Sequence, residues 1–295
     1  MSQTLSRPLP AYPRPAAGLD EETPRLARPL PDRLSAQKLL SRGQAVSLTV
    51  FVTAVLSLLG LRITTGLGPS LLAWAVGAVA AATVAYVAVI TFRLVLVMAA
   101  QEAPVMRFTP EELRAFPDSD LPGYSLLVPL HREERVLPAL IAKLSSIDYP
   151  ADRLQVLLLI EEDDEPTRAA LDRIILDSRF EVVLVPPSQP RTKPKACNVG
   201  LSRARGEFCV IYDAEDRPEP DQLRKAVLAF RRLPQWVVCV QAELQYWNPW
   251  TNWLTRCFAA EYALNFSLVL RGLDRFRLPI PLGGTSNHFR VEALR

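Results

Sequence analysis

Two long uncharged stretches dominate the hydrophobic pattern of the first hundred residues. No Asp, Glu, Lys or Arg occurs at 45–61 or at 63–92, and the second stretch contains a turn with two glycines and a proline at 64–69. A membrane-spanning helix needs about 20 apolar residues. The pattern therefore predicts a transmembrane hairpin within 45–103, with spans near 45–63 and 70–92. The alternative, a buried hairpin in a soluble core, fits poorly because the second stretch exceeds an ordinary globular helix.

Basic residues predict the orientation of this hairpin. Arg33, Lys38 and Arg42 precede the first span and Arg93 closes the second, whereas only Arg62 lies between them. Basic residues concentrate on the cytoplasmic side of membrane proteins. We therefore expect a multi-pass protein of the cell (inner) membrane, with its N-terminus and the domain after the hairpin in the cytoplasm.

Prolines are frequent in 1–44 and in 104–123. A proline-rich segment with little apolar periodicity buries too little surface to offset the entropy lost on ordering. Residues 1–44 are therefore predicted to be a disordered cytosolic tail. Residues 104–123 are predicted to be a linker, with a short helix that the capping pair Thr109 and Glu112 would start.

From residue 124 onwards, short apolar runs of strand length alternate with helical segments. Strands are expected at 125–128, 154–160, 181–185 and 208–212, and helices at 136–146, 168–176, 195–204 and 222–231. This alternation is typical of a parallel sheet with right-handed crossovers. The predicted fold class of 124–295 is therefore α/β, with a mostly parallel, Rossmann-like sheet.

Acidic residues follow three of these strands. Glu133 follows the first strand, four acids at 161–164 follow the second, and Asp213, Glu215 and Asp216 follow the fourth. Parallel strands bring their carboxyl ends to one edge of the sheet, where open α/β sheets bind ligands. Carboxylates there can hold Mg²⁺ or Mn²⁺, and the basic residues of 191–195 can offset a diphosphate. The pattern favours a nucleoside-diphosphate site over the alternative, a solvated acidic turn that caps the next helix.

Composition and missing motifs argue against several other kinds of site. The net charge of +3 does not indicate a nucleic-acid-binding protein. The four cysteines lack C-x-x-C spacing and fit reduced, buried thiols, while two histidines do not support a histidine-rich zinc site. His288, next to Asn287, is expected to be structural. Neither a P-loop nor a G-x-G-x-x-G follows a strand.

Six short motifs, in their order and spacing, resemble the family-two glycosyltransferases, in particular the cellulose-synthase-like membrane branch. They are VPLHREE at 128–134, LIEE at 159–162, KACN at 195–198, DAE at 213–215, Gln241 with YWNP at 246–249, and GGTS at 283–286. The resemblance covers 124–295. It implies a type-A nucleotide-sugar transferase fold and inverting transfer of a sugar, from a UDP-sugar as the expected donor, to a growing polysaccharide or other glycan.

The resemblance also implies roles for individual residues. The donor contacts would be Pro129, Glu133, Glu162, Asp164, Lys195, Asn198 and Asp213. The residues holding Mg²⁺ or Mn²⁺ would be Asp213, Glu215 and Asp216, and the metal would stabilise the leaving nucleoside diphosphate. The acceptor side would be Gln241, Gly284, Thr285 and Ser286. The remaining partners would be a glycan acceptor and the lipid bilayer.

The family supplies its general base from an acidic pair some way after the GTS loop. Only nine residues follow that loop here, and Glu292 is the sole acid among them. We therefore expect no catalytic base within the chain. The base would lie beyond Arg295, and a chain without it would bind donor but turn over poorly as a hexosyl- or N-acetylhexosaminyltransferase.

Two other functions stay open on the sequence alone. A sugar-phosphate nucleotidyltransferase uses a similar acidic edge, but it usually carries a glycine-rich stretch after the first strand, and 129–135 contains no glycine. A non-catalytic membrane protein could retain the nucleotide-sugar pocket as a sensor. The aromatic residues of 249–273 fit helices lying against the bilayer, sugar stacking or core packing, and the family resemblance favours the bilayer.

Overall fold

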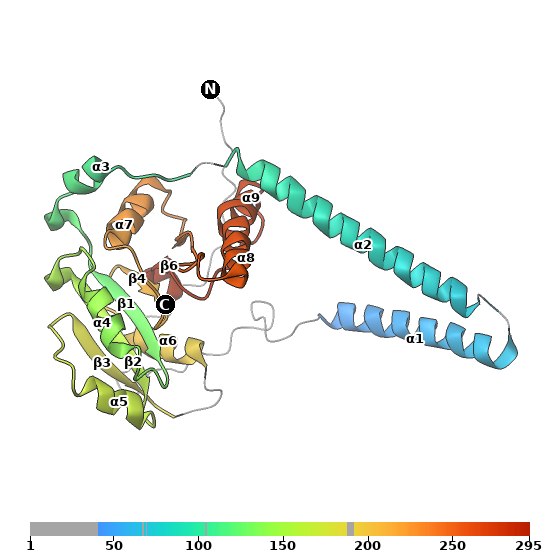
Figure 1. Cartoon of the computed structure of the whole chain (residues 1–295), viewed down its shortest axis with the longest axis horizontal. Helices are drawn as coiled ribbons and strands as arrows, with labels where there is room; N and C mark the ends of the chain where they lie inside the picture. The colour runs from blue at the N-terminus through green and yellow to red at the C-terminus, as the bar shows by residue number, and fades with distance from the viewer. Residues whose placement is uncertain (1–40, 67, 69, 104, 188–191) are drawn as a thin grey trace. The chain divides into compact units, whose positions relative to one another are not determined.

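The computed structural model describes residues 41–295 apart from 67, 69, 104 and 188–191 (Figure 1). These residues form two compact units, which we call the sheet unit (108–240 and 284–295) and the helical unit (41–107 and 241–283). Most of the tail predicted to be disordered, residues 1–40, lies outside the described residues. Residues 42–44 are helical rather than part of that tail, because Ser41 and Gln44 form a capping box that starts the first helix there.

The sheet unit confirms the predicted mostly parallel α/β architecture. Its strands run in the order β3-β2-β1-β4-β6-β5, and the pairs β1–β2, β2–β3 and β1–β4 are all parallel. The strands are β1 (Tyr124–Leu130), β2 (Leu154–Glu161), β3 (Phe180–Val185), β4 (Phe208–Ile211), β5 (Cys239–Gln241) and β6 (Asn287–Arg290). β6 was not predicted, and it runs antiparallel to β4.

Alternating residues of the strands build a core on each face of the sheet. Leu126 and Val128 of β1 pack into one cluster of buried residues, whereas Leu127 packs into the other. This follows from the strand period of two, which sends successive side chains to opposite faces. Because both faces are covered, β2 is buried at all eight positions. Continuous apolar runs of this kind are expected of parallel strands.

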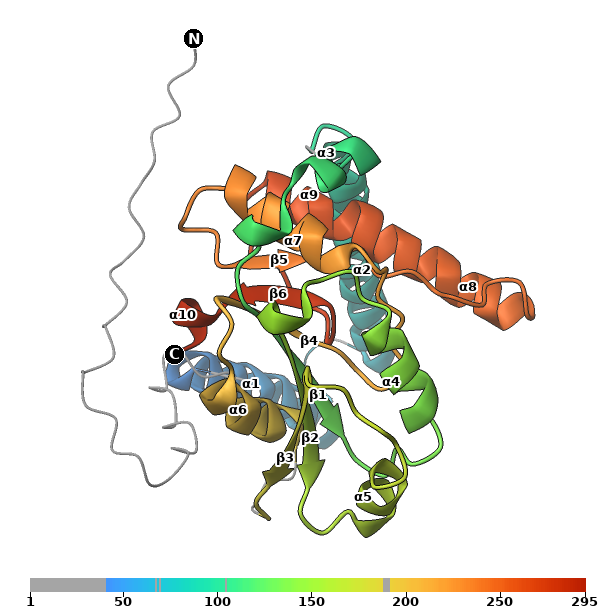
Figure 2. The same cartoon turned by 90° about the vertical axis from the view of Figure 1, so that its left-hand side faces the viewer.

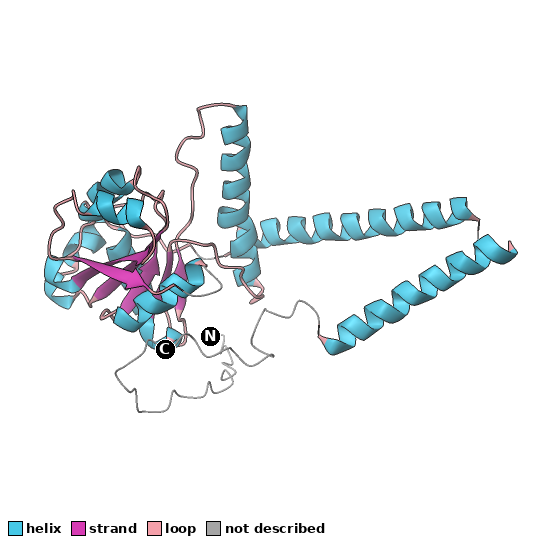
Figure 3. Ribbon diagram, turned by 90° about the horizontal axis from the view of Figure 1, so that it is seen from below, coloured by secondary structure: helices cyan, strands magenta, loops and turns pink. Residues whose placement is uncertain are grey.

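Helices cover both faces, and Figure 2 shows α6 on one side of the strands with α4 and α5 on the other. Figure 3 shows the strands as one layer among these helices. The main helices of this unit are α4 (Leu137–Ser145), α5 (Glu165–Leu171), α6 (Lys193–Arg203) and α7 (Gln222–Arg232). The shorter elements are α3 (Pro110–Ala115), η2 (Asp118–Asp120), η3 (Ala151–Arg153) and α10 (Val291–Leu294). The predicted capping box of Thr109 and Glu112 starts α3.

Helix α5 begins and ends earlier than the sequence pattern indicates. It was expected at 168–176, but Asp164 caps it by accepting a hydrogen bond from the backbone N–H of Thr167 at 3.3 Å. Pro166 occupies its first turn. A proline is tolerated there because the backbone N–H groups of the first turn have no acceptor within the helix. The acidic end of β2 therefore runs directly into the helix.

The helical unit contains two helices that are long and apolar enough to cross a membrane, α1 (Arg42–Thr65) and α2 (Leu71–Ala100). The unit also contains α8 (Trp253–Tyr262), the π-helical segment η4 (Ala263–Val269) and α9 (Leu270–Arg275). α2 continues past Arg93 to Ala100, so it is longer than the predicted span.

Helix α9 packs closely on the carboxyl end of α2. A Cβ on Gly272 would lie 2.2 Å from the carbonyl oxygen of Leu96, so only glycine allows this approach. The guanidinium of Arg271 donates to the carbonyl oxygens of Ala100 and Ala103 at 2.9 and 3.0 Å. The Ala100 carbonyl also accepts the backbone N–H of Ala103 at 3.2 Å, so Arg271 adds a second donor there and holds the turn that follows α2.

Candidate functional site

The carboxyl ends of three neighbouring strands bring the acidic loops of the sheet unit together. Tyr124, Leu154 and Phe208 begin β1, β2 and β4 side by side in parallel register. The loops that follow these strands therefore leave the sheet at the same edge, as the sequence predicted. We call this edge the acidic rim and define it by residues 131–134, 162–164 and 212–216.

Backbone hydrogen bonds tie the first two rim loops to each other. The backbone N–H of Arg132 donates to Asp164 Oδ2 at 2.6 Å, and that of Glu133 donates to Thr167 Oγ1 at 3.0 Å. Burial raises the pKa of Asp164, but the hydrogen bonds from Arg132 and Thr167 outweigh it, so this pKa lies below its ordinary value. Asp164 thus stays charged while it organises the two loops.

This arrangement places Arg132 in a left-handed backbone conformation, with φ of 59°. Such a conformation is uncommon for residues other than glycine, asparagine and aspartate. It is maintained here by the hydrogen bond from the Arg132 N–H to Asp164. The loop after β1 therefore turns back across the rim.

Carboxylates from different loops lie near enough to influence one another. Burial raises the pKa of Glu133, and the negative charges of Glu215, Glu134 and Asp164 raise it further. Glu215 itself is exposed. The rim thus presents several negative charges that repel one another, and such a cluster attracts a cation.

Asp216 connects the loop after β4 to the loop before β6. Its Oδ2 accepts the backbone N–H of Asp213 at 2.6 Å and also the hydroxyl of Thr285. Burial raises the pKa of Asp216, and the hydrogen bonds from Thr285 and Asp213 offset part of this rise. Thr285 and Asp213, which belong to separate motifs, are therefore joined through one carboxylate.

Lys193 makes a second connection between the same loops. Its ammonium Nζ donates to Asp213 Oδ1 and to the carbonyl oxygen of Gly284. The Lys193 and Asp213 side chains are 33% and 30% exposed, so this ion pair is open to solvent. Lys193 was predicted only as part of a basic segment at the rim, and not as a residue of the site.

Lys195 makes a different ion pair, in the interior of the unit. Its Nζ lies 2.9 Å from Glu161 Oε2, and the two side chains are only 7% and 9% exposed. The structure thus directs Lys195 to the end of β2. Its expected contact with the donor stays a prediction.

The other predicted donor contacts occupy varied positions. Pro129 lies in β1 and is half-buried, whereas Glu162 and Asn198 are exposed. Gly284 is exposed, and Ser286 is buried with φ of 55° and donates its backbone N–H to the carbonyl oxygen of Ile211 at 2.8 Å. The structure thus brings Asp213, Asp216, Gly284 and Thr285 together.

Gln241 belongs to the helical unit. Neither atom of its side-chain amide has a hydrogen-bond partner among the described residues. A Cβ on Gly283 would come within 2.7 Å of this amide nitrogen. An amide that is buried without partners can serve a ligand, and the acceptor role of Gln241 stays a prediction.

The residues of the rim fit a divalent cation of the Mg²⁺ or Mn²⁺ type. Within the described ranges, no group of three or more His, Cys, Asp and Glu side chains is arranged to hold a metal. Asp216 accepts two hydrogen bonds on Oδ2 and Asp213 accepts Lys193 on Oδ1, so the second oxygen of each carboxylate, together with the exposed Glu215, could face a cation. Mg²⁺ is commonly bound by one or two carboxylates together with substrate phosphates, so two donors are enough.

Side-chain direction explains what the sequence pattern missed at the rim. Asp164 caps a helix, Asp216 joins two loops, and Lys193 contacts Asp213. The only sequence signal for Lys193 was its spacing from Lys195. Residues two apart on a helix do not share a face, so the two lysines point in different directions. That spacing indicates that just one of the two lysines faces the sheet.

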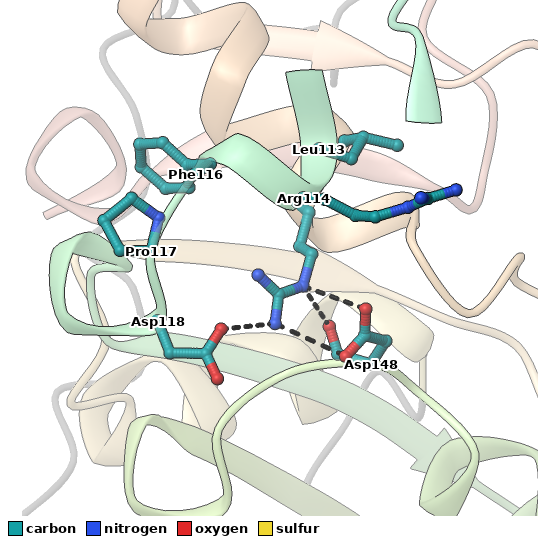
Figure 4. Close-up of a pocket in the computed structure, with 7 residues that line it drawn as sticks. Leu113, Arg114, Phe116, Pro117, Asp118 and Asp148 are labelled. Carbon is teal, nitrogen blue, oxygen red and sulfur yellow. Dashed lines mark hydrogen bonds and ion pairs between the residues drawn. The ribbon is translucent and has the colours of Figure 1, made fainter. Parts of the chain in front are cut away.

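A pocket of about 280 Å³ lies elsewhere in the sheet unit (Figure 4). It is lined by Leu113, Arg114, Phe116, Pro117, Asp118, Asp148 and Arg224. The guanidinium of Arg224 lies 2.6 Å from Asp118 Oδ1 and 3.0 Å from Asp148 Oδ2. None of the predicted donor contacts lines this pocket, and Arg224, Asp118 and Asp148 are already paired with one another, so we do not assign it to the site.

The chain is similar to several known proteins. The family model described as Glycosyl transferase family 2 matches residues 125–292. "Probable glycosyltransferase YdaM" from Bacillus subtilis (strain 168) is 28% identical over 102 residues, which cover 34% of this chain and 24% of that protein. "Beta-monoglucosyldiacylglycerol synthase" from Synechocystis sp. is 28% identical over 171 residues, which cover 56% of this chain and 35% of that protein.

A solved structure is also similar. It is the "Mannosyltransferase PcManGT from Pyrobaculum calidifontis in complex with GDP-Man and Mn2+", with a TM-score of 0.41 and 22% identity over 54% of this chain and 46% of that chain. The present chain thus spans about a quarter to a third of the length of the two curated relatives.

Proposed function

The chain belongs to glycosyltransferase family 2, and from this we propose that its acidic rim binds the diphosphate of a nucleotide sugar together with Mg²⁺ or Mn²⁺. UDP is the proposed nucleotide. The sugar would pass with inversion to a glycan, in a hexosyl- or N-acetylhexosaminyl transfer. The observation that supports this proposal best is the position of Asp213 at the end of β4, half-exposed and oriented by Asp216.

Each rim residue has a distinct part in this proposal. Asp213 and Glu215 hold the cation, and Asp216 fixes the Asp213 backbone and the Thr285 hydroxyl. The bound cation stabilises the charge that develops on the leaving diphosphate. Glu133, Glu162 and Asn198 face the nucleotide, and Gly284, Thr285 and Ser286 serve the acceptor.

We further propose that α1 and α2 anchor the protein in the cell membrane, with the sheet unit in the cytoplasm. Both helices carry exposed apolar side chains along their length, such as Phe51 at 66% and Val84 at 70% exposure. The exposed indoles of Trp250 and Trp253 in the same unit fit the interface between lipid and water. The relative from Synechocystis, by its name, makes a diacylglycerol glycolipid, which agrees with a membrane location.

The donor proposal is tested by calorimetric titration of UDP into the detergent-solubilised protein, with Mn²⁺ or with EDTA. We expect UDP to bind with Mn²⁺ and to lose at least about 30-fold in affinity in EDTA or in Asp213→Asn, because removing one partner of a bound charge costs about 2 kcal/mol or more. Asp172→Asn, which changes an exposed aspartate after α5, is the matched control and should bind normally.

Circular dichroism should first show that both variants are folded. The proposal is wrong if neither UDP nor GDP binds the wild type in Mn²⁺. It is also wrong if Asp213→Asn binds UDP as tightly as the wild type does, because the rim carboxylate would then have no part in binding.

A further inference from the structure

Lys193 connects three separate parts of the sheet unit. It lies at the start of α6, and its ammonium contacts Asp213 after β4 and the backbone of Gly284 before β6. Asp213 is the residue that the proposed function assigns to the cation. The cation that this structure places on Asp213 is therefore a side chain of the protein itself.

Charge balance explains why a lysine lies there. Asp213, Asp216, Glu215 and Glu133 gather at the rim, and their negative charges raise the free energy of the site when no cation is present. Lys195 is engaged with Glu161 in the interior and does not serve the rim. A lysine ammonium is a compact charge with three donors, and it can reach both a carboxylate and a carbonyl.

The ammonium and a divalent cation cannot share Asp213 without cost. Two cations on one carboxylate would lie within about 4 Å of each other, where like charges repel strongly even near a protein surface. Because this ion pair is one-third exposed, Lys193 can leave Asp213 into solvent without desolvating a buried charge.

We propose that Lys193 is an internal counter-ion of the donor site, which holds Asp213 until a divalent cation displaces it. This inference rests on the proposed function. Displacement also breaks the bond from Lys193 to the Gly284 carbonyl, so metal loading frees the loop at Gly284–Ser286 from α6. Metal binding thereby changes the contacts of the predicted acceptor loop by way of Lys193, which is not itself a metal ligand.

The first test measures the reactivity of Lys193 in the wild-type protein. Limited acetylation followed by peptide mass spectrometry compares labelling without metal and with Mn²⁺ alone, and electron paramagnetic resonance measures the Mn²⁺ bound. Lys225 is a matched internal control, because it too is ion-paired, with Glu219 and Asp221, and its side chain is 32% exposed. We expect Mn²⁺ to increase the labelling of Lys193 at least threefold and to leave Lys225 unchanged.

The second test measures affinity for Mn²⁺ in two variants that each lose one positive charge. Lys193→Met should bind Mn²⁺ at least fivefold more tightly than the wild type, whereas Lys225→Met should differ by less than twofold. Equal or weaker binding by Lys193→Met would overturn the inference.

The outcomes separate this inference from the proposed function. If Mn²⁺ binds in a manner lost in Asp213→Asn, but labelling of Lys193 does not rise, the inference is wrong and the metal site stands. If no Mn²⁺ binds to the wild type or to Lys193→Met even with UDP present, the metal part of the proposed function fails and the inference fails with it.

Discussion

Lys193 and Lys195 lie two residues apart at the start of α6, yet they belong to different regions of the sheet unit. Lys195 pairs with Glu161 in the interior, where both side chains are less than a tenth exposed. Lys193 pairs with Asp213 at the rim, where both are about a third exposed. Two steps along a helix rotate a side chain by about 200°, which sends the two lysines in different directions.

The difference shows that burial decides what a lysine–carboxylate ion pair can do. The interior pair cannot exchange partners, because a separated lysine or glutamate would remain buried and charged. The rim pair can exchange, because water solvates either partner when it leaves. We therefore expect the interior pair to matter for stability and the rim pair to matter for ligands.

The largest expected effect comes from breaking the interior ion pair of Lys195 and Glu161. Lys195→Met leaves Glu161 buried without its partner and should lower the free energy of unfolding by about 3 to 5 kcal/mol. Lys193→Met should lower it by less than about 1 kcal/mol, because its ion pair is partly exposed. Urea unfolding followed by circular dichroism measures both values.

A double variant checks the reason for that loss. Adding Glu161→Leu to Lys195→Met removes the uncompensated charge, so the pair of substitutions should regain most of the lost stability. Equal losses from Lys193→Met and Lys195→Met would contradict the division between rim and interior.

A second buried group, His288, extends the comparison to pH. His288 lies in β6, its Nδ1 shares a 2.6 Å hydrogen bond with the Tyr124 hydroxyl, and burial lowers its pKa to about 3. Its Nε2 has no hydrogen-bond partner among the described residues. The histidine therefore stays neutral in the folded protein, in agreement with the predicted structural role.

This lowered pKa makes stability depend on pH in a defined direction. Below the ordinary pKa of about 6.5, the unfolded chain gains a proton at His288 that the folded protein does not bind. The contribution of His288 is thus fully present above pH 6.5 and falls by about 1.4 kcal/mol per pH unit as the pH drops towards 3.

A double substitution, Tyr124→Phe with His288→Leu, replaces both partners by apolar groups and should abolish this part of the pH dependence. Between pH 7 and pH 4, the wild type should lose about 3 kcal/mol more than the variant, since the pH then spans about 2.5 units below the ordinary pKa of histidine. Urea unfolding at the two pH values measures the difference. Parallel losses in both proteins would show that His288 is protonated in the fold.

The smallest expected effect concerns the backbone of the rim. Arg132 is held at φ of 59°, and its side chain is exposed. Asparagine adopts this conformation more readily than arginine does, so Arg132→Asn should stabilise the protein by about 0.5 to 1 kcal/mol. Arg135→Asn, at a neighbouring exposed position without a positive φ, is the control and should give no gain. Thermal unfolding detects the difference, and a loss of stability in Arg132→Asn would show that the arginine side chain has a role.

The order of the central strands and helices could be predicted because each strand of the parallel sheet is a short apolar run. The acidic rim followed from the same rule, since parallel strands end at one edge. β6 could not be predicted, because its four residues include Asn287, His288 and Arg290 and so do not form an apolar run. The strand forms by pairing with β4, which is distant in the sequence.

The roles of individual side chains at the rim were also beyond the sequence pattern. Four acids follow one another at 161–164, but Glu161 points to Lys195 while Asp164 caps α5. Asp216 and Asp213 are three residues apart, yet one accepts a hydrogen bond from the backbone of the other. These differences depend on side-chain direction and burial, which spacing alone does not determine.

The close contact of α9 with α2 has a consequence for how the chain is made. Arg271 follows Ala100 by 171 residues. A ribosome adds about 5 to 20 residues per second, so about 10 to 30 s pass between the synthesis of Ala100 and that of the guanidinium that contacts its carbonyl. Nearly all of the sheet unit is synthesised during that interval. Synthesis of the helical unit therefore begins first, but α9 can pack on α2 only after residues 108–240 have been made. A ribosome that stalled within 108–240 would leave α2 without its partner helix.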